Sequence, residues 1–332
     1  MRQPKRHISN FTALLLPTCS AALYPIVSPA SMDFLLPTEL TFSFPSGIIM
    51  AMLATEDRPR ALTQWKRLAA RLKCVRCETI GLRLLADKPA GVNCPACGTL
   101  YRFQEGVLDL VPAEGAFSSP PEYEGFLPTF HHWTLTRRFL LRLNWGVSAR
   151  KLYSLLEAAI ADLTEGFCLD LPLSASTLLT PQYYAYSHLT FVAADVSWQL
   201  LRQTRQRLRA LPEENVLLVR ADVHTLPFRP ASFAAVRCLY GLHTFADRPW
   251  ALQELTAVLQ PGGRFAACAY VRGERWLSDR VAGLFVKSGH FAPGATVEEF
   301  NRWFAATDLE FLDATVVGGF LLVQALRRSP SE

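Results

Sequence analysis

The sequence predicts an α/β protein built around a largely parallel β-sheet, preceded by a small metal-binding segment. The apolar runs 216–219 and 233–239 are strand-like, and residues 250–259 carry apolar side chains at helical spacing. A Pro-Gly-Gly run at 261–263 ends that helix before the next apolar stretch. Strand, loop, strand, helix and strand in this order are typical of parallel crossover units. Two paired-cysteine motifs predict the metal-binding segment.

Composition is that of a folded protein with no extreme charge. The chain has 332 residues, of which 50% are hydrophobic and 19% are charged, so a large core is expected and a disordered chain is excluded. The formal net charge of +5 permits an anionic partner such as RNA but does not require one. Cys168, Cys238 and Cys268 fall in apolar runs. Buried free thiols there favour a reducing compartment, so we expect a cytoplasmic protein.

Residues 1–66 differ from the rest of the chain. Basic residues precede an apolar run that is interrupted by Pro17 and Pro25. We interpret this segment as a poorly ordered extension, with a targeting segment as the alternative. The two prolines break the apolar run, so we expect no stable membrane span. The Pro-, Gly-, Ser- and Glu-rich residues 113–133 are typical of a linker between domains at 67–112 and 134–328.

The metal-binding segment depends on four cysteines, Cys74, Cys77, Cys94 and Cys97. Cysteines two residues apart let two thiolates reach one metal from a tight turn, and two such turns complete a four-thiolate shell. Such a closed shell is typical of structural Zn²⁺, so 67–112 is predicted to be a zinc ribbon. The alternatives are a redox pair or cysteines without a role. Neither pair is followed by helical periodicity, which disfavours the redox alternative.

A more specific pattern follows in residues 215–265. It combines Leu-Pro-Phe at 226–228, Leu-His-Thr-Phe at 242–245 and Pro-Gly-Gly at 261–263. At these separations the chain from about 167 to 326 resembles class I S-adenosylmethionine-dependent methyltransferases of the type 11 group. With the four cysteines it resembles the zinc-ribbon methyltransferases of bacteria and chloroplasts. The resemblance implies a Rossmann-like, seven-stranded mixed sheet with an antiparallel closing strand, and S-adenosylmethionine as cofactor.

The resemblance also implies a cofactor site at the carboxyl ends of the strands. Asp195 is expected to accept hydrogen bonds from the ribose hydroxyls and Asp222 from the adenine amine, with Val223 contributing its backbone amide. The full predicted set is Asp170, Pro172, Ser174, Ser176, Asp195, Val196, Asp222, Val223 and Leu239.

The turn after the first strand departs from the family. Its relatives have Gly-x-Gly where this chain has Ser-Ala-Ser at 174–176. Glycine lets the backbone approach a cofactor and adopt positive φ, which serine resists. Two outcomes stay open: the small residues preserve the cofactor site, or the loop no longer binds tightly.

The predicted catalytic residues are Tyr240 and His243, which end the fourth strand where methyl group and acceptor are expected to meet. His243 is interpreted as a general base or a hydrogen-bonding group for the substrate, with loop orientation as the alternative. Tyr240, Trp276 and Phe285 are expected to line an aromatic-rich acceptor pocket.

Three functions are compatible with these residues. The first is a methyltransferase acting on a small molecule or lipid precursor. The second is an RNA methyltransferase that docks through the zinc ribbon, which requires a continuous basic face. The third is a non-catalytic scaffold with a lapsed cofactor loop. We favour the first because charge on the ribbon is unremarkable. The sequence predicts no oligomeric state.

Overall fold

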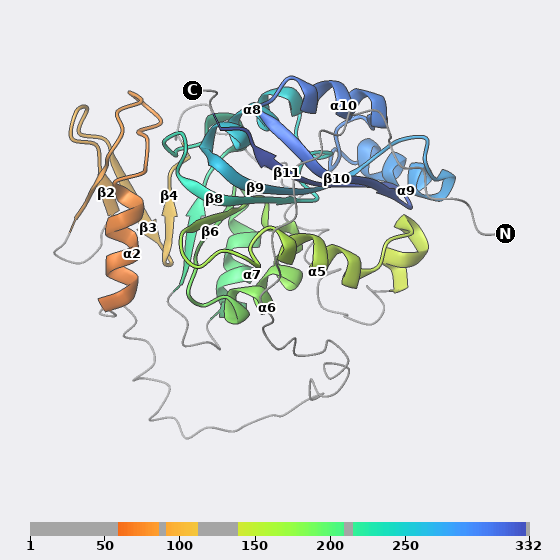
Figure 1. Ribbon diagram of the computed structural model, residues 1–332. Coiled ribbons are helices and arrows are strands. Elements are labelled where there is room, and N and C mark those ends of the chain that lie inside the picture. The colour runs from red at the N-terminus through yellow and green to blue at the C-terminus, as the bar shows by residue number, and fades with distance from the viewer. Residues whose placement is uncertain (1–58, 86–90, 112–138, 209–214, 330–332) are drawn as a thin grey trace. The chain divides into compact units, whose positions relative to one another are not determined.

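One β-sheet organises the described part of the chain (Figure 1). The computed structural model describes residues 59–85, 91–111, 139–208 and 215–329. The predicted linker 113–133 lies outside these residues, as does most of the predicted N-terminal extension. The strand order is β1-β2-β3-β4-β7-β6-β5-β8-β9-β11-β10. The strands are β1 (Arg83–Leu84), β2 (Gly91–Asn93), β3 (Leu100–Gln104), β4 (Val107–Asp109), β5 (Phe167–Asp170), β6 (Thr190–Asp195), β7 (Val216–Arg220), β8 (Phe233–Leu239), β9 (Leu259–Tyr270), β10 (Leu309–Val317) and β11 (Phe320–Arg327).

The predicted mixed α/β sheet is confirmed, but its strand number was wrong. Strands β7, β6, β5, β8 and β9 are parallel, and β11 and β10 close the sheet in antiparallel pairs. These are the seven expected strands. The described sheet has eleven strands, because β4 pairs in parallel with β7, and β3, β2 and β1 follow β4 in antiparallel pairs. The cysteine-bearing segment therefore extends the sheet rather than preceding it as a separate unit.

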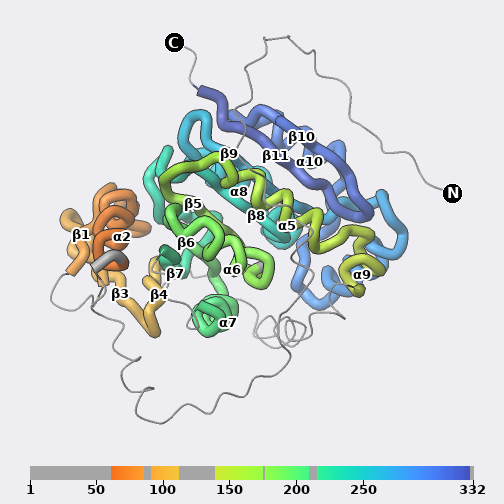
Figure 2. The backbone as a smooth tube through the Cα atoms, turned by 60° about the horizontal axis from the view of Figure 1, so that its bottom comes forward, coloured from red at the N-terminus to blue at the C-terminus, as the bar shows by residue number. Residues whose placement is uncertain are grey.

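Helices cover both faces of this sheet (Figures 1 and 2). Apolar side chains of α2, α8 and α10 join the core on one face, and those of α5, α6, α7 and α9 join the core on the other. The α-helices are α2 (Pro59–Ala69), α5 (Ala149–Ala158), α6 (Ser176–Ala185), α7 (Trp198–Leu208), α8 (Arg248–Val258), α9 (Trp276–Lys287) and α10 (Val297–Ala305). Three short turns of helix are η3 (Leu141–Trp145), η4 (Leu173–Ala175) and η5 (Val223–Thr225). Within the described ranges, no helix combines the length and apolar character that crossing a membrane requires.

Local signals place the helix that the sequence predicted at 250–259. Helix α8 begins after Asp247, whose side chain accepts a hydrogen bond from the backbone N–H of Trp250 at 3.0 Å. Pro249 occupies the first turn, where its missing N–H costs nothing. The helix then ends directly before β9, which contains the Pro-Gly-Gly run.

The chain is helical before residue 66, where the sequence analysis ended the N-terminal extension. Helix α2 begins at Pro59. Leu68 near its end and Leu72, three residues after it, are completely buried. Trp65 packs edge-on against Phe103 of β3, with ring centroids 4.8 Å apart. The ring contact attaches α2 to β3 of the cysteine-bearing segment.

Candidate active site

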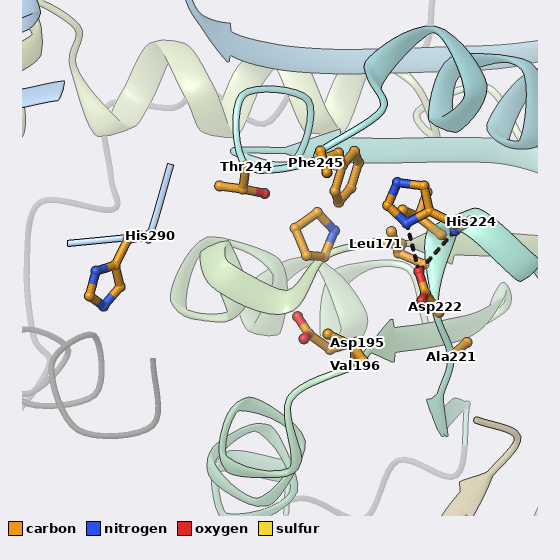
Figure 3. A pocket seen from close by; sticks show the side chains of 13 residues that line it. Leu171, Asp195, Val196, Ala221, Asp222, His224, Thr244, Phe245 and His290 are labelled. Carbon is orange, nitrogen blue, oxygen red and sulfur yellow. Dashed lines mark hydrogen bonds and ion pairs between the residues drawn. The ribbon is translucent and has the colours of Figure 1, made fainter. Parts of the chain in front are cut away.

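A pocket lies at the carboxyl ends of β5, β6 and β7, beside the loop that follows β8 (Figure 3). Strand β5 lies between β6 and β8, so the direction of strand order reverses at β5. Ligands of open α/β sheets bind outside the carboxyl ends of the strands at such a reversal. The pocket is lined by residues 171–172, 195–196, 221–224, 244–246 and 289–290.

The structure brings part of the predicted cofactor set together in this pocket. The residues that line it are Pro172, Asp195, Val196, Asp222 and Val223. The residues that do not line it are Asp170, Ser174, Ser176 and Leu239. Figure 3 shows the two aspartates on one side of the pocket and the Phe245 ring across from them.

Asp195 is the last residue of β6 and is only 4% exposed. Its Oδ2 accepts the backbone N–H of Leu173 at 2.8 Å, and its Oδ1 accepts that of Ser197 at 2.8 Å. Burial raises the pKa of this carboxyl to about 6, although the two N–H donors favour the charged form. Each carboxylate oxygen has a second lone pair, so Asp195 can hold the turn and still accept from a ligand hydroxyl.

Asp222 follows β7 and begins η5. Its Oδ1 accepts the backbone N–H of His224 at 2.9 Å and lies 3.0 Å from His224 Nδ1. These contacts use one carboxylate oxygen. The buried Nε2 of His224 has no hydrogen-bond partner within the described ranges. His224, which the sequence analysis did not select as a site residue, thus lines the pocket together with Asp222.

The Ser-Ala-Ser turn does not adopt the backbone conformation that glycine would favour. Residues 173–175 form the 3₁₀ turn η4; Ser176 has a φ of −52°, and Ser174 is not among the described residues with positive φ. Serine is not strained at such angles, so the expected penalty for replacing glycine does not arise. Ser174 Oγ donates to the Leu239 carbonyl at 3.2 Å, and Ser176 Oγ accepts from Arg207 at 2.8 Å. Both hydroxyls therefore tie the turn to neighbouring elements.

Asp170 makes an internal ion pair instead of facing the pocket. Its two oxygens accept from Nε and Nη2 of Arg237 on β8, both at 2.6 Å. Both side chains are completely buried. Arg237 Nη1 also donates to Gln182 Oε1 of α6. This bidentate pair joins β5 to β8 beneath the pocket.

The chain turns sharply after β8, where the catalytic residues were predicted. Tyr240 has a φ of +63°, an uncommon conformation for a residue with a side chain. Gly241 follows, and a Cβ there would lie 2.6 Å from Pro172 Cδ and 2.8 Å from Phe245 Cζ. Only glycine lets this loop approach the pocket so closely.

His243 is poorly suited to the predicted role of general base. Its side chain is buried, and burial, with a smaller contribution from the Arg248 charge, lowers the pKa of His243 to about 3. Its Nδ1 accepts the backbone N–H of Tyr270 at 3.1 Å, which leaves the proton of the neutral ring on Nε2. His243 can donate a hydrogen bond from Nε2 but cannot hold an additional proton at neutral pH.

His243 belongs to an aromatic cluster, only some members of which were predicted from the sequence. Trp145 is at its centre, with ring centroids 5.1 Å from Phe320, 6.1 Å from Phe291 and 6.5 Å from Phe285. The rings of this aromatic cluster are Trp145, Tyr240, His243, Tyr270, Phe285, Phe291 and Phe320. They come from segments far apart in the chain, so no local sequence motif predicts that they form a cluster.

Trp276, which was expected in the acceptor pocket, points away from the cluster. Its side chain is 70% exposed. Trp276 and Phe285 are nine residues apart on α9, which at about 100° per residue places them on opposite sides of the helix. Phe285 belongs to the aromatic cluster and Trp276 does not.

The four predicted metal ligands lie close together. All four Sγ atoms of Cys74, Cys77, Cys94 and Cys97 are within 4.8 Å of one another. The distance from Cys74 to Cys97 is 3.6 Å and that from Cys77 to Cys94 is 3.5 Å. A tetrahedral Zn²⁺ with bonds of about 2.3 Å requires sulfurs about 3.8 Å apart. The donor set and its spacing therefore fit a structural zinc ion.

Hydroxyl groups surround these sulfurs. Tyr101 Oη lies 3.1 Å from Cys74 Sγ, and Thr99 Oγ1 lies 3.1 Å from Cys97 Sγ. The side-chain contact with Thr99 is the main cause that lowers the pKa of Cys97 to about 6. Outer hydrogen bonds of this kind orient thiolate ligands and stabilise their charge.

Part of this chain, including pocket residues, is similar to known methyltransferases. Residues 174–267 match the family described as a methyltransferase domain. A chloroplast methyltransferase of Arabidopsis thaliana is 29% identical over 192 residues, which cover 54% of this chain and 54% of the relative. A demethylmenaquinone methyltransferase of Clavibacter sepedonicus is 38% identical over 118 residues, covering 36% and 47%.

A third relative is also named as a quinone methyltransferase. A 2-phytyl-1,4-naphtoquinone methyltransferase of Nostoc is 38% identical over 79 residues, covering 24% of this chain and 34% of the relative. The chain thus spans about half the length, or less, of these curated relatives. The matched residues include β6, β7, β8 and the pocket loops that follow them.

Proposed function

We propose that this chain, which contains a domain of the S-adenosylmethionine-dependent methyltransferase type, transfers a methyl group to a quinone-type small molecule. The observation that carries the proposal is the pair of aspartates at the ends of β6 and β7, lining one pocket at the point where strand order reverses. Because the match covers only part of the curated relatives, their names support the substrate class without assigning it.

In this proposal each pocket residue has a binding task. Asp195 accepts hydrogen bonds from the ribose hydroxyls, and Asp222 accepts one from the adenine amine through the oxygen that His224 leaves unused. Val196 and Val223, which follow these two aspartates in the chain, line the same pocket. S-adenosylmethionine supplies an activated methyl group when bound. The chain then needs chiefly to align the acceptor and exclude water, which can account for about 7–11 kcal/mol of the barrier.

The aromatic cluster favours an apolar acceptor. Trp145 packs against Phe291 and Phe320 with tilted rings, and a flat quinone ring can pack against aromatic side chains in the same way. The polar groups of this cluster include the Tyr240 hydroxyl and the Nε2 proton of His243. We assign His243 the role of a hydrogen-bond donor to the acceptor, because its low pKa makes it a weak base.

The alternative of an RNA acceptor finds less support. A continuous basic face would have to connect the cysteine-bearing segment with the pocket. Three arginines of α7 and β7 have internal partners: Arg202 pairs with Glu105, Arg220 with Asp109, and Arg207 with Ser176. Their charges are partly used within the chain.

Binding and transfer can be tested separately. Calorimetric titration with S-adenosylmethionine and S-adenosylhomocysteine is expected to give saturable binding of both ligands. Transfer of labelled methyl groups to demethylmenaquinone is expected in the same preparation. A chain that binds neither ligand is a scaffold and contradicts the proposal. One that binds both ligands but methylates only RNA contradicts the acceptor class alone.

We also propose that the four-cysteine cluster holds one structural Zn²⁺. Elemental analysis of the purified protein is expected to give one zinc per chain. Cys94→Ser is expected to abolish the zinc and lower the melting temperature, because metal binding supplies much of the folding energy of so small a segment. Cys168→Ser is the matched control, since Cys168 is also buried but lies outside the cluster. Equal zinc content in the two variants would contradict the assignment.

A further inference from the structure

The surface formed by η3 and α9 exposes large apolar side chains. Trp276 and Leu284 of α9 are 70% and 67% exposed, and Phe139 and Leu143 are 64% and 45% exposed. The described residues contain few apolar side chains this exposed, and the two most exposed are both on α9. Patches of this kind on a soluble domain mark interaction sites. We call this surface the η3–α9 face.

The two parts of the η3–α9 face are held together. Arg275 Nη1 and Ser278 Oγ of the α9 region both donate to the Asn144 carbonyl of η3, at 2.6 and 2.8 Å. Trp145 and Phe285 stack at the same junction. Both views place η3 beside α9 (Figures 1 and 2). The exposed side chains of η3 and α9 therefore lie on two segments that are fixed to each other.

The same face is basic. Helices η3 and α9 together carry three basic residues, Arg142, Arg280 and Lys287, against one acidic residue, Asp279. Asp279 is turned inward, where it accepts from Tyr270 Oη at 2.7 Å and from the N–H of Gly273 at 3.1 Å. On α9, Arg280 and Lys287 lie on the same side as Trp276, because residues four and eleven positions apart share a helix face. The Arg280 guanidinium lies 5.8 Å from the centre of the Trp276 ring.

We propose that the η3–α9 face docks on an anionic lipid surface. A helix with tryptophan and leucine beside arginine and lysine is suited to the boundary between lipid headgroups and acyl chains. The basic charge complements phospholipid headgroups of negative charge. It also disfavours a second copy of the chain as the occupant, because a symmetric contact would bring Arg280 and Lys287 against the same groups.

This inference rests on the proposed function and adds a route for the acceptor. Phe285 and Trp145 lie under the η3–α9 face and belong to the aromatic cluster. A quinone with a long apolar tail resides in lipid. Docking at this face places the aromatic cluster next to the membrane, which shortens the path of the acceptor through water.

Vesicle sedimentation tests the docking without cofactor or acceptor. The intact chain is expected to bind vesicles of phosphatidylcholine and phosphatidylglycerol, and to bind phosphatidylcholine alone much more weakly. High salt is expected to release most of the bound protein. Changing Arg280 and Lys287 together to glutamine is expected to weaken binding about 30-fold, since each basic residue contributes about fivefold. Trp276→Ala is expected to weaken it about tenfold.

Leu312→Ala is the matched control, because Leu312 is 54% exposed on β10 and does not belong to the η3–α9 face. It is expected to bind vesicles like the unchanged chain. Equal binding to neutral and anionic vesicles, or an equal loss in Leu312→Ala and Trp276→Ala, would overturn the proposal. So would a dimer in sedimentation velocity that Trp276→Ala dissociates, since the face would then be an interface between copies.

Failure of the docking and failure of the proposed function give different results. If vesicle binding is absent but the calorimetric titration shows cofactor binding, the docking is wrong and the methyltransferase proposal stands. If vesicles bind but the cofactor does not, the face serves some other membrane-bound activity and the proposed function is wrong.

Discussion

Changing Arg237 to methionine is expected to lower the free energy of unfolding by about 3–5 kcal/mol, the usual cost of breaking a buried ion pair on one side. The change leaves the Asp170 carboxylate buried without the guanidinium that donates two hydrogen bonds to it. It also removes a donor from Gln182. Urea denaturation of the unchanged chain and the variant measures the difference.

The Arg202–Glu105 pair provides the control. Its partners are 3.2 Å apart and both side chains are 54% exposed. Glu105→Gln is therefore expected to change the free energy of unfolding by less than about 1 kcal/mol. The double change of Asp170 to leucine and Arg237 to methionine is expected to recover part of the loss, because no charge is left unpaired in the interior. Equal effects of Arg237→Met and Glu105→Gln would mean that the buried pair is not structurally important.

Asp195→Ala is expected to weaken binding of S-adenosylmethionine about 10- to 150-fold. A hydrogen bond to a charged group contributes about 1.5–3 kcal/mol, and the change also frees the N–H of Leu173 that holds the turn. Isothermal titration calorimetry measures the affinity. Asp313→Ala, which removes an exposed carboxylate of β10, is expected to bind like the unchanged chain. Unaltered affinity in Asp195→Ala would exclude this pocket as the cofactor site.

The protonation of Asp195 adds a pH dependence. Burial raises its pKa to about 6, so the carboxyl gains a proton as the pH falls below that value and then accepts hydrogen bonds less well. Affinity is expected to be constant above the pKa and to decline below it. Asp222, His224 and His290 also line the pocket, so the comparison needs a second variant. Asp195→Asn is expected to remove the part of the decline that belongs to Asp195.

Elements with local signals could be predicted from the sequence. Helix α8 has apolar periodicity, a capping aspartate and a Pro-Gly-Gly run after it, and its position was predicted within two residues. Asp195 and Asp222 were recognisable as acidic residues at strand ends. The pairing of β4 with β7 could not be recognised, because it joins residues more than a hundred positions apart and depends on sheet geometry.

The acceptor side of the site was harder to predict for the same reason. Trp145, Phe291 and Phe320 come from three separate segments and meet only in the folded chain. The role of Asp170 depended on Arg237, which lies in the middle of an otherwise apolar strand. Sequence spacing identified the carboxylate but not the partner that turns it inward.

The parallel pairing of β4 with β7 covers a sheet edge that would otherwise favour aggregation. Without β4, strand β7 would end the sheet and present its unpaired N–H and C=O groups beside the aliphatic run at 216–219. Exposed edges of this composition recruit strands from other molecules and nucleate aggregates. A chain shortened to begin after residue 112 is therefore expected to precipitate even with every pocket residue present. The cysteine-bearing segment would in that case protect the solubility of the enzyme, whatever it contributes to its catalysis.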